Sequence, residues 1–408
     1  MTGRARRLQL SRPVSIPMRW RLLDERTGAT LTDCAEVDGL FVGRVFPAEP
    51  LYERYTLLSC APDGPLLAAI GGTGPAWFGN VVVEGAHVPG RSVSQRCGDH
   101  CRRCYDTAEE LLDVRVVGHR PAVDGSNLLD VDLEGHRRKD ANNHGGTAPP
   151  VVLGYRLLTW STANGSVEET PSGQCRDIVG LFHERPDIWP PGPPLTLLGC
   201  RSGLTGSFEA ELAHVRVDGT VHTMGWGQRM FGSVVSTRPS DIGDDLVDIT
   251  VDAQIPEPMA ANARPLWDMW RAGGPTEPND WAKLDRSGRY LWVQAAAVHR
   301  SHAPDKPSGM VYHLDGRYVT DYDAFYCAIG EAVNGPGGWF GSDLFWLHEN
   351  AATGDGGAAP GFRLIWHNSE VARAHLVPGY DRKSWLPAIT FDDLVGYLTE
   401  DGVQLDLR

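Results

Sequence analysis

The chain reads CAEVDGLF at positions 34–41 and CRDIVGLF at positions 175–182. The two stretches share Cys, Gly, Leu and Phe at identical spacing. Two matching stretches so far apart are typical of an internal repeat, and a repeat governs the fold more strongly than any single motif. The region around both stretches is therefore predicted to contain two copies of one structural unit.

Three further pairs of matching blocks occur in the same order along the chain. They are WRLL (20–23) with YRLL (155–158), YTLLSC (55–60) with LTLLGC (195–200), and LLDVRVVGHRP (111–121) with LVDITVDAQIP (246–256). We predict two copies of one module, at residues 15–140 and 150–258, with Cys34 equivalent to Cys175 and Cys60 equivalent to Cys200.

Short alternating segments such as VRVVG and VDITVDAQI lie between Gly, Pro and Asp turns within both copies. Alternation of apolar and polar residues is typical of half-buried strands. The two copies are therefore predicted to be β-rich. A Trp-rich bridge, residues 259–309, follows them, and its segment RYLWVQAAAVHR fits either a strand or a helix.

The net charge of the chain disfavours some classes of binding partner and favours others. The formal net charge is −14 over 408 residues, and residues 310–408 hold 6 Lys and Arg against 14 Asp and Glu, which is −8. Direct nucleic-acid binding needs a basic surface, so a basic protein is the expected partner. No apolar run approaches the length of a membrane span and the start resembles no signal peptide, so we expect a cytoplasmic protein that does not bind membranes.

The first copy contains CGDHCRRC, which brings Cys97, Cys101 and Cys104 close together in the chain. Thiolates at such spacing can hold zinc, with His100, His87 or Cys60 as a fourth ligand. The other interpretation is that these are thiols without a metal. Zinc is therefore the cofactor that this cluster would hold if its thiolates bind a metal.

Motifs of common enzyme classes do not occur in the chain. The glycine-rich stretch at 70–79 has no Walker lysine, and there is no G-x-S-x-G and no H-E-x-x-H. No nucleophile is accompanied by a base. We expect a protein without enzymatic activity.

From Met310 the pattern changes to strands alternating with helices. MVYHLDGRYV reads as a strand and a turn, DYDAFYCAIGEAVN as a helix capped by Asp321 or Asp323, and GFRLIWHNS as a central parallel strand. SEVARAHL and TFDDLVGYLTEDG read as helices, the second capped by Thr390, and VQLDLR reads as the last strand. A small parallel sheet with helices packed against it is predicted.

Four motifs in this region resemble the barstar family, whose members inhibit barnase-type ribonucleases. They are LDGRYVTDYDAFYCAIGEA, GWFGSDL, FRLIWHNSEVA and GVQLDL, and the resemblance as a whole extends over residues 310–408. The resemblance implies that an aromatic residue of the glycine loop and carboxylates of the following helix block the cationic active site of a nuclease. The fold class expected for the whole chain is multidomain α+β, with a duplicated β-rich module and a C-terminal barstar-like α/β domain.

The resemblance assigns a partner-binding set to the segment GGWFGSDLFWLHEN. Trp339 and Phe340 match the paired aromatics, Gly341 the glycine, Asp343 the Asn position and Glu349 the second acidic position. Phe345 stands where the inhibitors have Asp, and it shares one helical face with Trp346 and Glu349. The face is either a partner-binding surface or packed against the Trp-rich bridge.

The expected function is that of an immunity-type inhibitor, which binds and blocks a basic ribonuclease or a related toxin nuclease. Because Phe345 replaces a family carboxylate, barnase itself is not the expected target. The alternative is a scaffolding or ligand-binding protein that acts through the duplicated module, with or without zinc.

Overall fold

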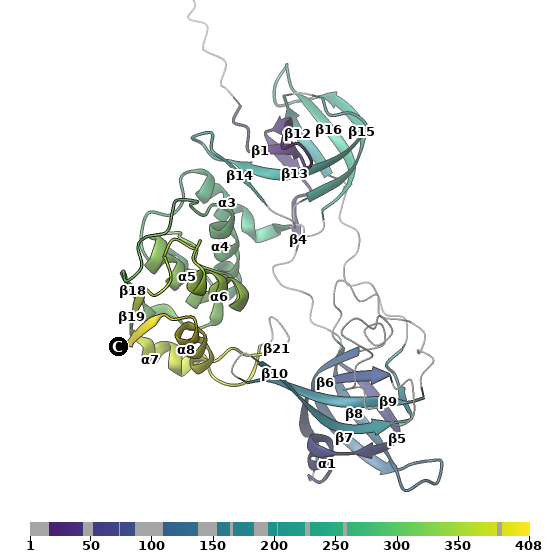
Figure 1. Cartoon of the computed structure of the whole chain (residues 1–408). Coiled ribbons are helices and arrows are strands. Elements are labelled where there is room, and N and C mark those ends of the chain that lie inside the picture. The colour runs from purple at the N-terminus through teal and green to yellow at the C-terminus, as the bar shows by residue number, and fades with distance from the viewer. Residues whose placement is uncertain are drawn as a thin grey trace, which may run out of the picture. The chain divides into compact units, whose positions relative to one another are not determined.

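A computed structural model describes the chain over residues 16–43, 52–72, 74–85, 109–137, 153–163, 166–182, 195–201, 203–224, 229–255, 259–381 and 386–408 (Figure 1). The fold is mixed α/β with more strand than helix. It divides into two compact units, residues 1–45 with 190–367 and residues 46–189 with 368–408. Within the described residues, no helix has the length and apolar character needed to cross a membrane.

The first unit contains a β-barrel built from two distant parts of the chain. Its strands follow the order β2-β1-β13-β15-β16-β12-β3, and β14 pairs with β13. Arg201 N donates to Asp33 O at 3.0 Å and Ala35 N donates to Leu198 O at 2.9 Å, which joins β2 to β12. The bounds are β1 Trp20–Asp24, β2 Thr30–Cys34, β3 Glu36–Asp38, β12 Leu195–Cys200, β13 Ser207–Val215, β14 Val221–Thr223, β15 Arg229–Pro239 and β16 Val247–Gln254.

The second unit contains a barrel of the same construction. Its strand order is β10-β9-β6-β7-β8-β5-β11, and β10 also pairs with β5, which closes the sheet. A short helix, α1 (Gly64–Ile70), follows β5. The bounds are β5 Tyr52–Pro62, β6 Ala76–Gly85, β7 Glu109–Pro121, β8 Leu129–Arg137, β9 Tyr155–Ala163, β10 Ser166–Cys175 and β11 Asp177–Val179.

Each barrel takes strands from both predicted copies. The first barrel joins residues 20–38 to residues 195–254, and the second joins residues 52–137 to residues 155–179. The predicted boundaries at 15–140 and 150–258 therefore do not coincide with the two sheets, because strands β1 to β3 pair with the later part of the chain. Position by position, the two strand orders place β2 with β10, β1 with β9, β13 with β6, β15 with β7, β16 with β8, β12 with β5 and β3 with β11.

The same bulge interrupts β5 and β12. In both strands the register shifts just before a cysteine, at Cys60 against β8 and at Cys200 against β16. The preceding residues have left-handed backbones, φ 51° at Ser59 and φ 62° at Gly199. The segment VDITVDAQ forms β16, whose counterpart in strand order is β8. The segment 111–121, which the sequence matches to it, lies instead in β7.

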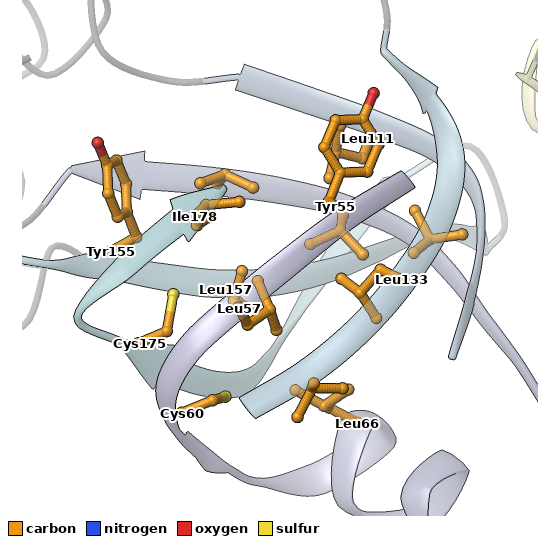
Figure 2. Close-up of a cluster of buried hydrophobic side chains, with 14 of the residues drawn as sticks. Tyr55, Leu57, Cys60, Leu66, Leu111, Leu133, Tyr155, Leu157, Cys175 and Ile178 are labelled. Carbon is orange, nitrogen blue, oxygen red and sulfur yellow. The ribbon is translucent and has the colours of Figure 1, made fainter. Parts of the chain in front are cut away.

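The core of the second barrel is formed by inward-facing side chains from all around the sheet (Figure 2). Leu57, Leu133 and Leu157 are fully buried there. Cys60 and Cys175 lie in the same core, although they belong to different predicted copies. In the first barrel the matching pair is Cys34 and Cys200, both fully buried.

The Trp-rich bridge is helical, which decides the open interpretation of RYLWVQAAAVHR in favour of a helix. Helix α3 spans Arg264–Arg271, a 3-10 turn spans Asp280–Lys283, and α4 spans Arg286–Val298 with Asp285 as its N-cap. A short parallel pairing of β17 (Met259–Ala260) with β4 (Phe41–Gly43) connects the bridge to the first barrel.

Residues 310–367 complete the first unit. Strand β18 (Val311–Asp315) pairs in parallel with β19 (Arg363–His367). Between them lie α5 (Tyr322–Asn334) and α6 (Leu344–Ala352). The predicted N-cap of the first helix is confirmed as Asp321, whose side chain accepts from Ala324 N at 2.8 Å.

Residues 368–408 belong to the second unit, so the division falls within the predicted domain 310–408. The predicted elements are present as α7 (Ser369–His375), α8 (Phe391–Glu400) and β22 (Gln404–Leu407), and β20 (Tyr380–Asp381) pairs with β21 (Leu386–Pro387) between the helices. Thr390 caps α8 and forms a capping box with Asp393.

Candidate functional site: the solvent face of helix α6

Helix α6 begins where the sequence predicts a helix after the glycine loop. Asp343 is its N-cap, and its carboxylate accepts from Trp346 N at 2.9 Å. An Asp at this position satisfies a backbone N–H that has no partner within the helix. Asp343 is thus an exposed member of the predicted set that also starts the helix.

Two large aromatic side chains of α6 are open to solvent. Phe345 is 63% exposed and Trp346 is 39% exposed, whereas Leu347 on the opposite face is fully buried. Their rings meet edge to face with centroids 5.4 Å apart. The helix therefore presents an aromatic pair outward while its leucine anchors it to the unit.

Residues 339–341 of the glycine loop before α6 are buried rather than exposed. Trp339 is 4% exposed, Phe340 is fully buried and Gly341 is buried. The three loop residues that the resemblance assigns to partner binding therefore do not lie on the solvent face of α6. Of the predicted partner-binding set, the solvent face of α6 keeps Asp343, Phe345, Trp346 and the half-buried Glu349.

Close backbone packing explains why the loop is buried. A Cβ added to Gly330 in α5 would come within 2.3 Å of the Gly338 carbonyl oxygen, so only glycine lets the loop approach this helix. Asn334 Nδ2 donates to the carbonyl oxygens of Trp339 and Gly356, each at 2.7 Å. Gly337 lies against Pro275 of the bridge, where an added Cβ would come within 2.4 Å of that ring.

Arg300, just beyond the end of α4, contacts the aromatic residues from the bridge side. Its guanidinium carbon is 4.9 Å from the Trp339 ring centre and 5.9 Å from that of Trp346. Contacts of this kind are attractive because the ring face carries negative charge density. The bridge thus covers Trp339 and one side of Trp346 and leaves Phe345 exposed, so packing against the bridge accounts for only part of this face.

Sequence reasoning missed Arg300 and Asn334, which fix the loop. Arg300 lies in HRSH at the end of the bridge, and nothing in its local pattern distinguishes it from a solvated arginine. Asn334 ends a helix just before a Gly-Pro-Gly-Gly loop, and that context is a usable signal for a side chain that binds loop carbonyls.

The predicted zinc ligands Cys97, Cys101 and Cys104 lie outside the described residues. Across the ranges that are described, no group of His, Cys, Asp and Glu has the geometry to hold a metal ion. Burial raises the pKa of the Cys60 thiol to about 12. At neutral pH Cys60 is therefore a protonated core residue.

A second cluster in the first unit consists of three histidines in contact, His214, His222 and His299. His299 Nδ1 donates to the Ala295 carbonyl oxygen at 2.7 Å, which leaves its Nε2 to accept from His214 Nδ1 at 2.9 Å. Burial lowers the pKa of His214 to about 3 and that of His299 to about 4. Both rings are therefore neutral at pH 7.

Comparisons with known proteins do not assign the chain to a family. No protein-family model, curated protein or solved structure matches the chain.

Proposed function

We propose that the chain is a non-enzymatic, immunity-type inhibitor that binds a basic ribonuclease or related toxin nuclease through the solvent face of α6. The observation that carries the proposal is the exposed pair Phe345 and Trp346, which stand side by side on a helix anchored by buried Leu347. A barstar-like domain at residues 310–408 is part of the same proposal.

The exposure of the pair supports a binding role. Contiguous aromatic surface on a soluble domain commonly marks an interaction site, and tryptophan is among the residues that contribute most to protein interfaces. Trp346 is already held by Trp339 and Arg300, so little side-chain entropy is lost when a partner covers it.

The charge around the face supports a basic partner. Residues 310–408 carry −8 of the net charge of −14, and Asp343 and Glu349 flank the aromatic pair along the helix. Arg300 lies on the Trp346 side, so basic groups of a partner are expected to approach from the side of Phe345 and Glu349. A negative field attracts a basic protein over a distance of about 10 Å and increases its association rate.

The replacement of a family carboxylate by Phe345 bears on the choice of target. A carboxylate at this position would pair with a cation of the nuclease, whereas a phenyl ring needs an apolar or planar surface. The proposed target is therefore a nuclease with a flatter, less strongly cationic site than barnase. Arginine side chains of such a target can stack on Phe345 and Trp346.

We also propose that the two barrels are copies of one duplicated module whose first three strands are exchanged. Support comes from the corresponding strand orders and from the position of the cysteines, since Cys34 ends β2 where Cys175 ends β10. A shared hydrogen bond adds to this: Ser59 N donates to Asp130 Oδ1 at 3.0 Å, and Gly199 N donates to Asp248 Oδ1 at 3.0 Å. The role of these barrels is then to carry the inhibitory domain.

Titration of the full chain against a panel of basic, barnase-type ribonucleases by isothermal titration calorimetry tests the proposed function. We expect 1:1 binding to at least one member, and a loss of at least about 2 kcal/mol when both Phe345 and Trp346 are replaced by Ala. Phe231→Ala is the matched control, because Phe231 is also exposed, at 42%, but lies on β15 of the first barrel. Equal binding by the double variant would contradict the proposal.

A further inference from the structure

A cavity of about 180 Å³ lies within the first unit, where the β13–β14 turn, the bridge and the glycine loop meet. Arg216 lines it from the turn, Trp270, His299 and Arg300 from the bridge, and Trp339 from the loop. The exposed residues Phe345 and Trp346 do not line it. The cavity is therefore distinct from the solvent face of α6.

Two arginines line this cavity without forming an ion pair, although Asp218 interacts electrostatically with one of them, Arg216. Among the ion pairs of the described residues, none involves Arg216 or Arg300. Other arginines of the same unit are paired, for example Arg264 with Glu36 and Arg289 with Asp321. In a chain of net charge −14, two unpaired guanidinium groups at one cavity are unusual.

Two residues of the lining also carry buried hydrogen-bond donors that lack acceptors. Nε of Arg216 and Nε1 of Trp339 are buried, and neither has a hydrogen-bond partner within the described part of the chain. Trp339 is only 4% exposed, so water does not readily replace a missing acceptor. Buried donors without acceptors are costly and are usually satisfied by a water molecule or a bound ligand.

The remaining lining groups define what can bind. His299 offers no free N–H, because Nδ1 donates to Ala295 and Nε2 accepts from His214. Asp355 is the one carboxylate in the lining, and it makes no ion pair with Arg216 or Arg300 within 4.0 Å. Two guanidinium groups favour a compact ligand with several acceptor oxygens.

We propose that this cavity binds a small oxyanion, a phosphate group, through the guanidinium groups of Arg216 and Arg300. Planar guanidinium groups bind phosphate with two parallel hydrogen bonds, which is stronger than contact with a point charge. The proposal adds a small-molecule site that nuclease inhibition does not require, so its test is independent of the proposed function.

The proposal predicts how substitutions at the cavity change phosphate affinity. Inorganic phosphate is titrated into the full chain by isothermal titration calorimetry, with acetate at equal ionic strength as the second ligand. We expect saturable 1:1 binding of phosphate, at least about tenfold weaker in Arg216→Gln and in Arg300→Gln. Asp355→Asn is expected to bind more tightly, because it removes a like charge from the lining and Asn tolerates the left-handed backbone of φ 75° at this position.

Matched controls and contrary outcomes complete the experiment. Arg26→Gln removes one positive charge from an exposed turn of the same barrel and is expected to leave the affinity unchanged. Equal phosphate affinity in Arg216→Gln, Arg300→Gln and the parent chain would overturn the proposal. So would binding of acetate with the same affinity as phosphate, or an absence of saturable phosphate binding.

Discussion

The ring of Trp346 meets the ring of Trp339 edge to face with centroids 5.8 Å apart, although Trp339 is buried and Trp346 is 39% exposed. The pair links the interior of the first unit to the solvent face of α6. The buried indole supports the exposed one, so the position of Trp346 does not depend on a partner.

Replacement of Trp346 by Ala separates the binding role from packing. Because the side chain is partly exposed and its supporting residues stay in place, we expect the melting temperature of the chain to change little, with a stability loss of about 1 kcal/mol or less. Binding to a nuclease should fall by at least about 2 kcal/mol. Differential scanning calorimetry and titration on the same preparation give both values. A large loss of stability with unchanged affinity would assign Trp346 to packing alone.

Glu349→Gln changes charge on the solvent face of α6 while nearly preserving shape. We expect a slower association rate with a basic nuclease at low salt and little difference at about 1 M salt, where the screening length is only about 3 Å. The dissociation rate should change less. Stopped-flow measurements at several salt concentrations check this, and a salt-independent effect would contradict a steering role.

Asp130 and Asp248 offer a test of the equivalence of the two barrels. Each accepts a backbone N–H at the same bulge, and the two residues are 1% and 4% exposed. Asp130→Ala and Asp248→Ala should each cost about 1–3 kcal/mol, since each leaves a backbone N–H without an acceptor. Asp245→Ala, in the exposed turn before β16, is the control. Chemical denaturation checks the prediction, and a cost at only one of the two positions would argue against equivalence.

The strands and helices of this chain were largely predictable, but the pairing of the strands was not. Alternation and turns are local signals, whereas the partner of β1 lies in β13, on the far side of the intervening second barrel sequence. The motif LLDV occurs at 111–114 and again at 128–131, and only the strand order shows that the second is the counterpart of LVDI at 246–249. A repeat in the sequence predicts that two copies of a module exist. It does not show which strands pair with each other in each barrel.

The candidate site was predictable in part for a similar reason. The helical spacing of Phe345, Trp346 and Glu349 placed them on one face, because that relation depends on the helix alone. The burial of Trp339 depends on Arg300 and on close contact between Gly330 and Gly338, which belong to other elements. No local pattern around Trp339 reports these contacts.

The histidine cluster predicts how stability depends on pH. The folded pKa values of His214 and His299, about 3 and about 4, lie below the ordinary value of 6.5. The unfolded chain therefore takes up protons first as the pH falls. The contribution of the two histidines to the free energy of unfolding is fully present above about pH 6.5 and is lost toward pH 4. Each histidine contributes a slope of up to about 1.4 kcal/mol per pH unit.

Denaturation of the parent chain and of His299→Gln between pH 7 and 4.5 measures this contribution. The free energy of unfolding of the variant should decline less steeply as the pH falls. The difference in slope corresponds to at most one proton taken up on unfolding, whatever the stability of the variant at pH 7. Identical slopes would mean that His299 keeps an ordinary pKa in the folded chain.

Inhibition of RNA hydrolysis is the most direct test of the central claim that the solvent face of α6 blocks a nuclease. The full chain is titrated into an activity assay for each member of the panel of basic, barnase-type ribonucleases, in parallel with Trp346→Ala and Phe231→Ala. We predict stoichiometric inhibition of at least one enzyme by the parent chain and by Phe231→Ala, and inhibition at least about tenfold weaker by Trp346→Ala. Full activity of every enzyme in the presence of excess parent chain, or equal inhibition by Trp346→Ala, would contradict the account.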